Sequence, residues 1–507
     1  MAPVPPATPA KPPEVFDRDA EWDALVGFAA DPRPGPGLGM VSGRLRQGKT
    51  FLLDALTTAM DGFSFGAQEA VEADSLRQLG DRLAAFTATE GAGPTRNGVT
   101  RDRPPQDWAE AVDALLALGE HRPVPVVIDG FPQLVRQSPS LPAVLHAAYG
   151  RFAEAGAGSR TRLLLCGSTQ PMMRRLFGGP APLKGLLGLE LIVRPFDFRQ
   201  AARFWGIDDP RLALRVYAVV GGTPAYRGAY SGGTEPPSTP EEFDAWVCGT
   251  VLNARTPLFQ EARLLLHEAT DREDRALCHS VLTAVALGAA TPGEVAGRLR
   301  TSLADVSHAL ALLQDCALLR ADTDAFRPHV TRLYATDPLL AFEHAVVRPL
   351  RPPLAHGDAA GVWPAARDTF ESTVAPARFA EVCRAWARDH ASPGTFGGTP
   401  ARVGHGSLPS AGGGPGLDAE VVVRGEGDGG RPGAVLSVGR ARWGEVMDVH
   451  HLEVPRRMLG LLAERGDDVG GAVPACYSSA GFGPALRAAE EAGEVLLVGP
   501  ERLYHGS

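Results

Sequence analysis

The segment Gly43-Arg44-Leu45-Arg46-Gln47-Gly48-Lys49-Thr50 constrains this chain more than any other, because it has the G-x-x-x-x-G-K-[ST] form of a phosphate-binding loop. A short apolar stretch, Leu38 to Val41, precedes it, and a segment with a helical pattern, Phe51 to Leu56, follows it. The sequence therefore predicts a strand, a loop and a helix in the order that this motif requires.

The lysine of this motif stands out against the composition of the chain. The sequence has three lysines, Lys11, Lys49 and Lys184, and 47 arginines. A compact ammonium group folds over β- and γ-phosphates better than a forked guanidinium does, which explains a lysine here. Loop N–H groups and the positive end of the following helix would bind the phosphates, and the Thr50 hydroxyl would bind Mg²⁺.

A second element of the same site is the apolar run Val124 to Ile128, which ends at Asp129. A strand-end aspartate beside a phosphate loop usually reaches Mg²⁺ through water, so Thr50 and Asp129 are the predicted metal residues. The alternative interpretation is an aspartate that only caps a turn. Gly130 follows, and glycine cannot act as a general base, so nucleotide binding is better supported than hydrolysis and no catalytic residue is assigned.

Composition limits the remaining classes of protein. A chain of 507 residues suggests about three domains. We find no apolar run long enough to cross a bilayer and no signal peptide. Six scattered cysteines without a C-x-x-C pair predict reduced thiols in the cytoplasm and no zinc site. The formal charge of −9 argues against general nucleic-acid binding by the whole surface.

The first half of the chain alternates apolar runs with helical patterns from Val15 to about Tyr226. Continuous apolar strands between helices predict an α/β fold with a parallel sheet that is covered on both faces. Residues 1–13 are rich in proline and alanine and are predicted to be disordered.

With these motifs placed, residues 14–350 resemble the archaeal-type AAA+ ATPases, which are relatives of the signalling NTPases. Four segments are similar to motifs of that family: Phe16-Asp17-Arg18-Asp19-Ala20-Glu21-Trp22, Cys166-Gly167-Ser168, Gly221-Gly222-Thr223-Pro224-Ala225-Tyr226 and Arg332-Leu333-Tyr334-Ala335-Thr336-Asp337-Pro338. The resemblance implies a P-loop NTPase that binds ATP with Mg²⁺. The ATP-binding residues it implies are Gly43, Arg44, Leu45, Arg46, Gln47, Gly48, Lys49, Thr50, Asp129 and Ser168.

Two positions depart from the family pattern. Gly130 stands where the family usually has a glutamate, and Gly185-Leu186 stands where it usually has Gly-Arg. Both departures remove groups for hydrolysis and leave those for binding.

The resemblance also implies a domain organisation. The expected parts are a disordered tail (1–13), a P-loop ATPase core (14–198), a helical lid (199–270), a winged helix-turn-helix (271–350) and a degenerate restriction-endonuclease-like α/β domain (351–507). Residues 276–337 contain five arginines, no lysine and six acidic residues, a charge that is wrong for a DNA-reading module. We favour an arm or protein contact for this module over DNA binding, which stays an alternative.

The C-terminal part resembles a nuclease fold without its usual site. Asp418 matches an acidic strand, but Arg440 and Arg442 stand at the glutamate and lysine positions of the next strand. Guanidinium groups repel Mg²⁺, so we expect a scaffold that does not cleave nucleic acid.

Taken together, the sequence predicts an ATP-binding regulatory switch of the AAA+ type in the cytoplasm, with slow or no hydrolysis and no membrane association. A protein partner or self-association would receive the signal. The alternative is a DNA-binding ATPase of mobile-element or defence systems, which salt-dependent retention on DNA would distinguish.

Overall fold

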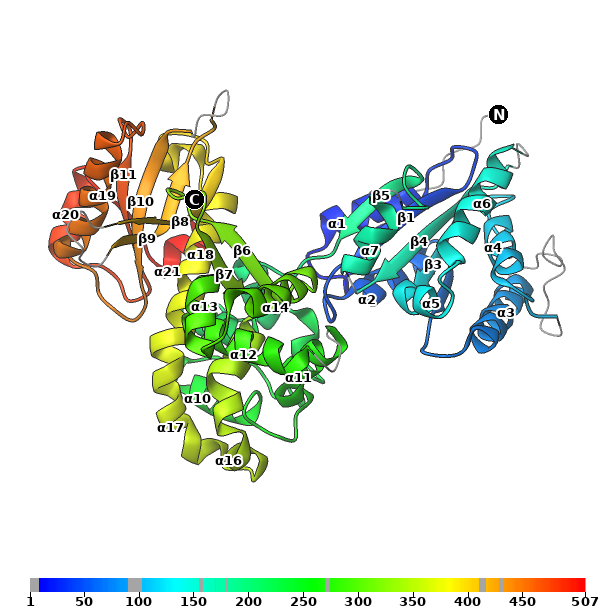
Figure 1. The fold of residues 1–507 in the computed structure, drawn as a ribbon, viewed down its shortest axis with the longest axis horizontal. Coiled ribbons are helices and arrows are strands. Elements are labelled where there is room, and N and C mark those ends of the chain that lie inside the picture. Colours follow the sequence, from blue (N-terminus) through cyan, green and yellow to red (C-terminus); the bar gives the residue numbers. More distant parts are fainter. Residues whose placement is uncertain are drawn as a thin grey trace. The chain divides into compact units, whose positions relative to one another are not determined.

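The computed structural model describes residues 9–89, 103–154, 158–168, 170–178, 181–269, 274–409, 416–427 and 433–506, and the chain forms two units, Met1–Pro195 and Phe196–Ser507 (Figure 1). Within the predicted N-terminal tail, residues 1–8 lie outside the described residues. Residues 9–13 contact the first unit, because the indole N–H of Trp22 donates to the Pro9 carbonyl at 3.2 Å and Lys11 pairs with Asp19 at 2.6 Å.

The first unit is built on a parallel sheet in which the strands lie in the order β2-β3-β4-β1-β5. Its strands are β1 (Gly37–Ser42), β2 (Phe63–Gly66), β3 (Val124–Asp129), β4 (Thr161–Gly167) and β5 (Leu187–Ile192). Its helices are α1 (Asp19–Ala29), α2 (Lys49–Ala59), α3 (Glu72–Thr89), α4 (Trp108–Ala117), α5 (Phe131–Gln137), α6 (Leu141–Glu154) and α7 (Gln170–Phe177). Because all strand pairs are parallel, the carboxyl ends of the five strands lie at the same edge of the sheet.

Two apolar layers cover this sheet, one on each face. Successive side chains of a strand point to opposite faces, so Leu163 and Leu165 of β4 pack with α3 to α6, and Leu164 packs with α1 and α2. This explains why the strands are apolar without alternation. The predicted mixed α/β fold with a parallel sheet is confirmed, and α1 coincides with the helix from Asp19 to Ala29 that the helical spacing of Trp22, Leu25 and Phe28 predicts.

The second unit begins with helices. They are α8 (Phe198–Trp205), α9 (Pro210–Val220), η1 (Pro224–Tyr226), η2 (Pro240–Glu242), α10 (Phe243–Gly249) and α11 (Pro257–Ala269). The Tyr226 hydroxyl donates to Asp337 at 3.0 Å, with both groups buried, and so joins this helical region to a segment more than a hundred residues later in the chain.

Three helices and an antiparallel pair of strands follow: α12 (Arg275–Ala286), α13 (Pro292–Leu299), α14 (Leu303–Asp315), β6 (Leu319–Thr323) and β7 (Thr331–Ala335). Thr291 caps α13, as the pattern of residues 291–299 predicts, and the structure adds a reciprocal capping box with Glu294. The apolar spacing of Val306, Leu310 and Leu313 predicts a helix from Ser302 to Leu319, but this prediction is wrong at its end, because α14 stops at Asp315. Ala317 adopts a positive φ of 54°, which ends the helix and starts β6.

A run of short helices connects to the C-terminal sheet. It comprises α15 (Pro338–Phe342), η3 (Glu343–Val347), η4 (Arg348–Leu350), α16 (Arg351–Ala355), α17 (Ala359–Thr369), η5 (Phe370–Val374), α18 (Ala375–Asp389) and η6 (Pro393–Phe396). No helix among the described residues is long and apolar enough to span a bilayer.

The C-terminal sheet is mixed, with the strand order β12-β11-β10-β9-β8. Its elements are β8 (Arg402–Leu408), β9 (Leu417–Arg424), β10 (Val435–Arg442), η7 (Val449–Leu452), α19 (Glu453–Glu464), β11 (Val473–Ser478), α20 (Pro484–Glu491), β12 (Leu496–Val498) and α21 (Pro500–His505). β9 runs antiparallel to both of its neighbours, β8 and β10, and β10, β11 and β12 are parallel.

Candidate nucleotide-binding site

The phosphate loop lies between β1, which ends at Ser42, and α2, which begins at Lys49. Gly43 has φ of +150°, and a Cβ there would lie 2.3 Å from the carbonyl oxygen of Val193. Gly48 has φ of +86° and directly precedes α2. Both glycines of the motif are therefore required by the backbone: the first by a close approach, the second by a left-handed conformation.

The Lys49 side chain folds back under this loop. Its Nζ donates to the carbonyl oxygens of Gly43 and Arg44, each at 2.8 Å, and the residue is 7% exposed. Burial lowers the pKa of Lys49, and the charges of Arg44 and Arg46 lower it further, although Cys166 and Asp129 oppose the shift. The loop thus gathers positive charge with few anionic neighbours, which is the electrostatic requirement of a polyphosphate site.

The two predicted metal residues come together at the mouth of the loop. The Thr50 hydroxyl donates to Asp129 Oδ2 at 2.5 Å, and the other Asp129 oxygen accepts the Gly130 N–H at 2.8 Å. A hydroxyl and a carboxylate present the hard oxygen atoms that Mg²⁺ prefers.

Strand register places Ser168 at the same edge. Gly167 of β4 pairs with Ser42, the residue before the loop, and Cys166 pairs with Asp129 across the other side of β4. Ser168 follows directly, so it lies between the ends of β1 and β3. Its contact with a nucleotide, like the other residue roles, stays a prediction.

The geometry at Gly130 explains its residue type. Gly130 has φ of +76° where α5 begins, and a Cβ there would lie 3.0 Å from the Ala67 carbonyl oxygen. A glutamate at this position would therefore be strained. The backbone conformation itself disfavours the acidic side chain that could act as a base here.

Two residues near the site escaped the sequence analysis. Asp54 is four residues after Thr50, so both lie on one face of α2, and Ser64 approaches Asp54 at 3.5 Å. Burial raises the pKa of Asp54, and the negative charge of Asp129 raises it further. The i, i+4 spacing after the motif is a signal that could have found it.

Arg18 is the other missed residue. Its guanidinium donates to the carbonyl oxygens of Arg194 at 2.7 Å and Gln47 at 3.4 Å and pairs with Glu21 at 2.8 Å. It therefore ties the start of α1 to the phosphate loop and to the segment after β5. In the sequence, Arg18 belongs to the family-like segment Phe16 to Trp22, which by itself indicates no role for this residue.

In the C-terminal sheet, the carboxylates expected of a nuclease are paired with arginines. Glu420 lies 3.1 Å from both Arg440 and Arg442, and Asp418 pairs with Arg332 at 2.9 Å. Guanidinium groups thus occupy the space beside these carboxylates in which a metal ion would have to bind.

No model of a protein family matches the chain, and no curated protein matches it in sequence. In shape it is similar to a Walker-type ATPase of Pyrococcus abyssi, with 18% identity, 67% of this chain and 98% of that chain covered, and a TM-score of 0.49. It is also similar to the ORC2 protein of Aeropyrum pernix in ADPNP–ADP complexes (16% identity, 71% and 97% covered, TM-score 0.42) and to Cdc6p from Pyrobaculum aerophilum (13% identity, 70% and 97% covered, TM-score 0.31). Identities and TM-scores this low establish neither family nor function.

Proposed function

We propose that this chain is an ATP-binding protein of the AAA+ type that acts as a nucleotide-dependent regulatory switch. The observation that carries the proposal is the contact between Thr50 and Asp129 at the mouth of the loop that Lys49 holds. A phosphate loop, a buried lysine and a hydroxyl–carboxylate pair at one sheet edge are the groups that a nucleoside triphosphate with Mg²⁺ requires.

The residues fit the ligand one by one. Lys49 would exchange its two carbonyl partners for β- and γ-phosphate oxygens, which are stronger acceptors because they are charged. Thr50 would bind Mg²⁺ directly, and Asp129 would hold it through water. Arg44 and Arg46 add positive potential to the same loop.

The site has fewer of the groups needed for ATP hydrolysis than of those needed for ATP binding. Gly130 offers no base, and Leu186, which replaces the arginine of the family pattern, packs against the apolar core. We therefore expect that nucleotide occupancy, rather than hydrolysis, sets the state of the protein.

The second unit fits a receiving arm better than a DNA reader. The exposed face of α14 includes Asp305 and Asp315, with His308 as its basic side chain. The connection between β6 and β7 is engaged by the C-terminal sheet, because the Ala325 N–H donates to the His405 carbonyl of β8 at 2.8 Å. In a winged helix, the connection between β6 and β7 would be the wing. Because the C-terminal sheet holds this connection, contact with a protein is favoured over binding in a DNA groove.

One experiment tests both halves of the proposal. A fluorescent ATP analogue is titrated into the full chain with Mg²⁺, and phosphate release is then measured on the same sample. We expect saturable binding and release well below roughly 1 s⁻¹, the lower end of ordinary enzyme rates. Absence of binding refutes the nucleotide site, and fast release refutes the switch.

A further inference from the structure

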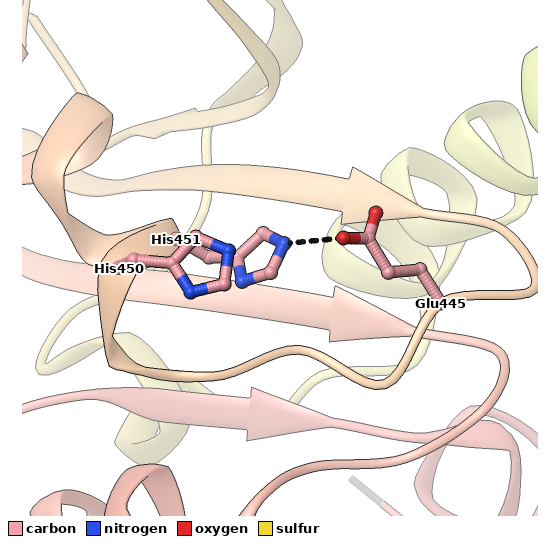
Figure 2. A group of neighbouring side chains, drawn as sticks. All are labelled: Glu445, His450 and His451. Carbon is pink, nitrogen blue, oxygen red and sulfur yellow. Dashed lines mark hydrogen bonds and ion pairs between the residues drawn. The ribbon is translucent and has the colours of Figure 1, made fainter.

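A group of three side chains outside the nucleotide site has the composition of a metal centre. Figure 2 shows Glu445, in the loop after β10, facing His450 and His451 of η7. One ligand atom from each residue lies within 4.8 Å of the others. Two imidazoles and one carboxylate are ligands that suit Zn²⁺ and similar transition metals.

The spacing is close to that of ligands on a shared ion. Glu445 Oε1 and His451 Nε2 are 3.0 Å apart. Metal–ligand bonds of about 2.1 Å place neighbouring ligand atoms about 3.0 to 3.4 Å apart in tetrahedral or octahedral geometry. The His450 ring lies against the His451 ring with centroids 3.9 Å apart, and a ring nitrogen of His450, whose side chain is exposed, lies within 4.8 Å of the other two ligand atoms.

The backbone that carries these side chains is fixed on both sides. The Glu445 carbonyl accepts the Ser478 hydroxyl at 2.7 Å. Met447 pairs with the next loop, where its N–H donates to Gly481 and its carbonyl accepts from Gly483. The ligands therefore need side-chain adjustment alone, which makes the ordering cost of binding an ion small.

His451 also has a partner for its second ring nitrogen. Its Nδ1 lies 3.1 Å from the Asp448 carbonyl oxygen and 3.0 Å from the Asp448 backbone nitrogen. Without an ion, Nδ1 accepts the backbone N–H and Nε2–H donates to Glu445. With an ion on Nε2, the proton moves to Nδ1 and is donated to the carbonyl, the usual outer contact of a metal-bound imidazole.

We propose that Glu445, His450 and His451 form a binding site for a divalent transition metal of the zinc class. Three protein ligands leave a coordination position open for water or for a group from a partner. The spacing of the cysteines predicts no cysteine-based zinc site, and the proposed ligand set contains no cysteine. The proposal is independent of the nucleotide site.

The simpler explanation is a histidine–glutamate ion pair with no ion. The chain offers a comparison: on the surface of α21, His505 pairs with Glu501 at 3.9 Å. Among the described residues, this pair is not part of a group of three ligands that could hold a metal ion. His505→Gln is therefore a matched control that removes an exposed imidazole without touching the proposed site.

The test is calorimetric titration of Zn²⁺ into the chelator-stripped full chain, without nucleotide and with excess Mg²⁺ to occupy ordinary carboxylates. We expect one tight equivalent per chain. His450→Gln and Glu445→Gln should each weaken it at least about tenfold, as loss of a supporting group does at known sites. His505→Gln should leave it unchanged. Co²⁺ substitution should give an absorption band that the first two variants lose.

The proposal is overturned if the parent binds no stoichiometric Zn²⁺, or if His450→Gln and Glu445→Gln bind it as the parent does. Thermal unfolding of each metal-free variant guards against misfolding. Both substituted side chains are exposed, so their melting temperatures should equal that of the parent. Should one variant melt early, the other, which alters a different element, decides the outcome.

Discussion

Lys49 concentrates more of the proposed chemistry than any other residue, because its buried ammonium donates to two carbonyl oxygens that phosphate oxygens could replace. We expect Lys49→Ala to weaken ATP–Mg²⁺ binding by roughly a hundredfold or more, since one charge-assisted hydrogen bond contributes about 1.5 to 3 kcal/mol and this ammonium would make several. Calorimetry measures the change. Lys184→Ala, which removes an exposed lysine, is the control and should bind as the parent does. Equal affinities for Lys49→Ala and the parent would remove Lys49 from the site.

Gly130 shows how a single residue limits what the site can do. We expect Gly130→Ala to lower the free energy of unfolding by about 1 to 2 kcal/mol, because the residue is left-handed and its Cβ would crowd the Ala67 carbonyl. Gly130→Asn should cost less, since asparagine tolerates this conformation.

Gly150→Ala is the control for that measurement, because Gly150 lies within α6 with open space at its Cβ and alanine favours a helix. Urea unfolding should show it equal to or more stable than the parent. A Gly130→Ala protein as stable as Gly150→Ala would contradict the strain.

At the scale of helices and strands, the elements that could be predicted from the sequence are those that a local residue pattern determines. The apolar runs Val124 to Ile128 (β3) and Arg162 to Cys166 (β4) and the N-cap at Thr291 were located correctly from the sequence, because burial and capping leave direct marks on residue type. The end of α14 was missed because Ala317 carries no sign of its positive φ. Asp54 was missed although its spacing of four residues from Thr50 places it on the same face of α2, and Arg18 was missed because its position depends on a tertiary approach that a motif does not encode.

The connection between β6 and β7 depends on one buried carboxylate, Asp324. It accepts the N–H groups of Phe326 at 3.0 Å and Ser407 at 3.2 Å, and His405, Arg327 and Arg332 surround it. Burial alone would raise the pKa of Asp324, but the hydrogen bonds from His405, Ser407 and the backbone hold it well below its usual range. Asp324 therefore stabilises the fold above about pH 4, and this contribution is lost as the pH falls from there toward its lowered pKa.

We expect Asp324→Asn to destabilise the protein by about 3 kcal/mol at neutral pH, because it removes a buried charge that accepts from Ser407 and the backbone and lies beside Arg327 and Arg332. The difference from the parent should shrink below about pH 4, where the parent carboxylate begins to be protonated. Chemical denaturation across this pH range measures both effects. Asp322→Asn, which removes a surface partner of Arg320, should change stability by less than about 1 kcal/mol. A constant difference at all pH values would refute the role of the charge.

At the scale of the whole molecule, the two acidic residues of β9, Asp418 and Glu420, are paired with arginines and so are not arranged for metal-dependent cleavage. We expect no cleavage of plasmid, linear duplex, single-stranded DNA or RNA in Mg²⁺ or Mn²⁺, because Glu420 is neutralised by Arg440 and Arg442 and Asp418 by Arg332. Gel assays with purified full chain test this. Cleavage that Asp418→Ala abolishes would show that the arginines move aside.

A switch needs a path from the nucleotide to the rest of the chain, and the covalent connection between the units begins beside the phosphate loop. The Val193 N–H donates to Ser42 at 2.8 Å, its carbonyl lies against Gly43, and Arg18 holds the Arg194 carbonyl. The chain enters the second unit two residues later, at Phe196. Ordering of the loop by ATP should therefore order this connection.

We expect hydrogen exchange at residues 193–196 to slow on addition of ATP–Mg²⁺ in the parent and to stay unchanged in Lys49→Ala, because only a filled loop fixes the backbone against which Val193 packs. The solvent-exposed end of α16, far along the chain from the loop, serves as an internal reference. Arg18→Ala, which removes the tie to Arg194 without altering the lysine, should retain nucleotide binding but show a smaller change at 193–196. Full protection in Arg18→Ala would mean that the signal leaves the loop by another route.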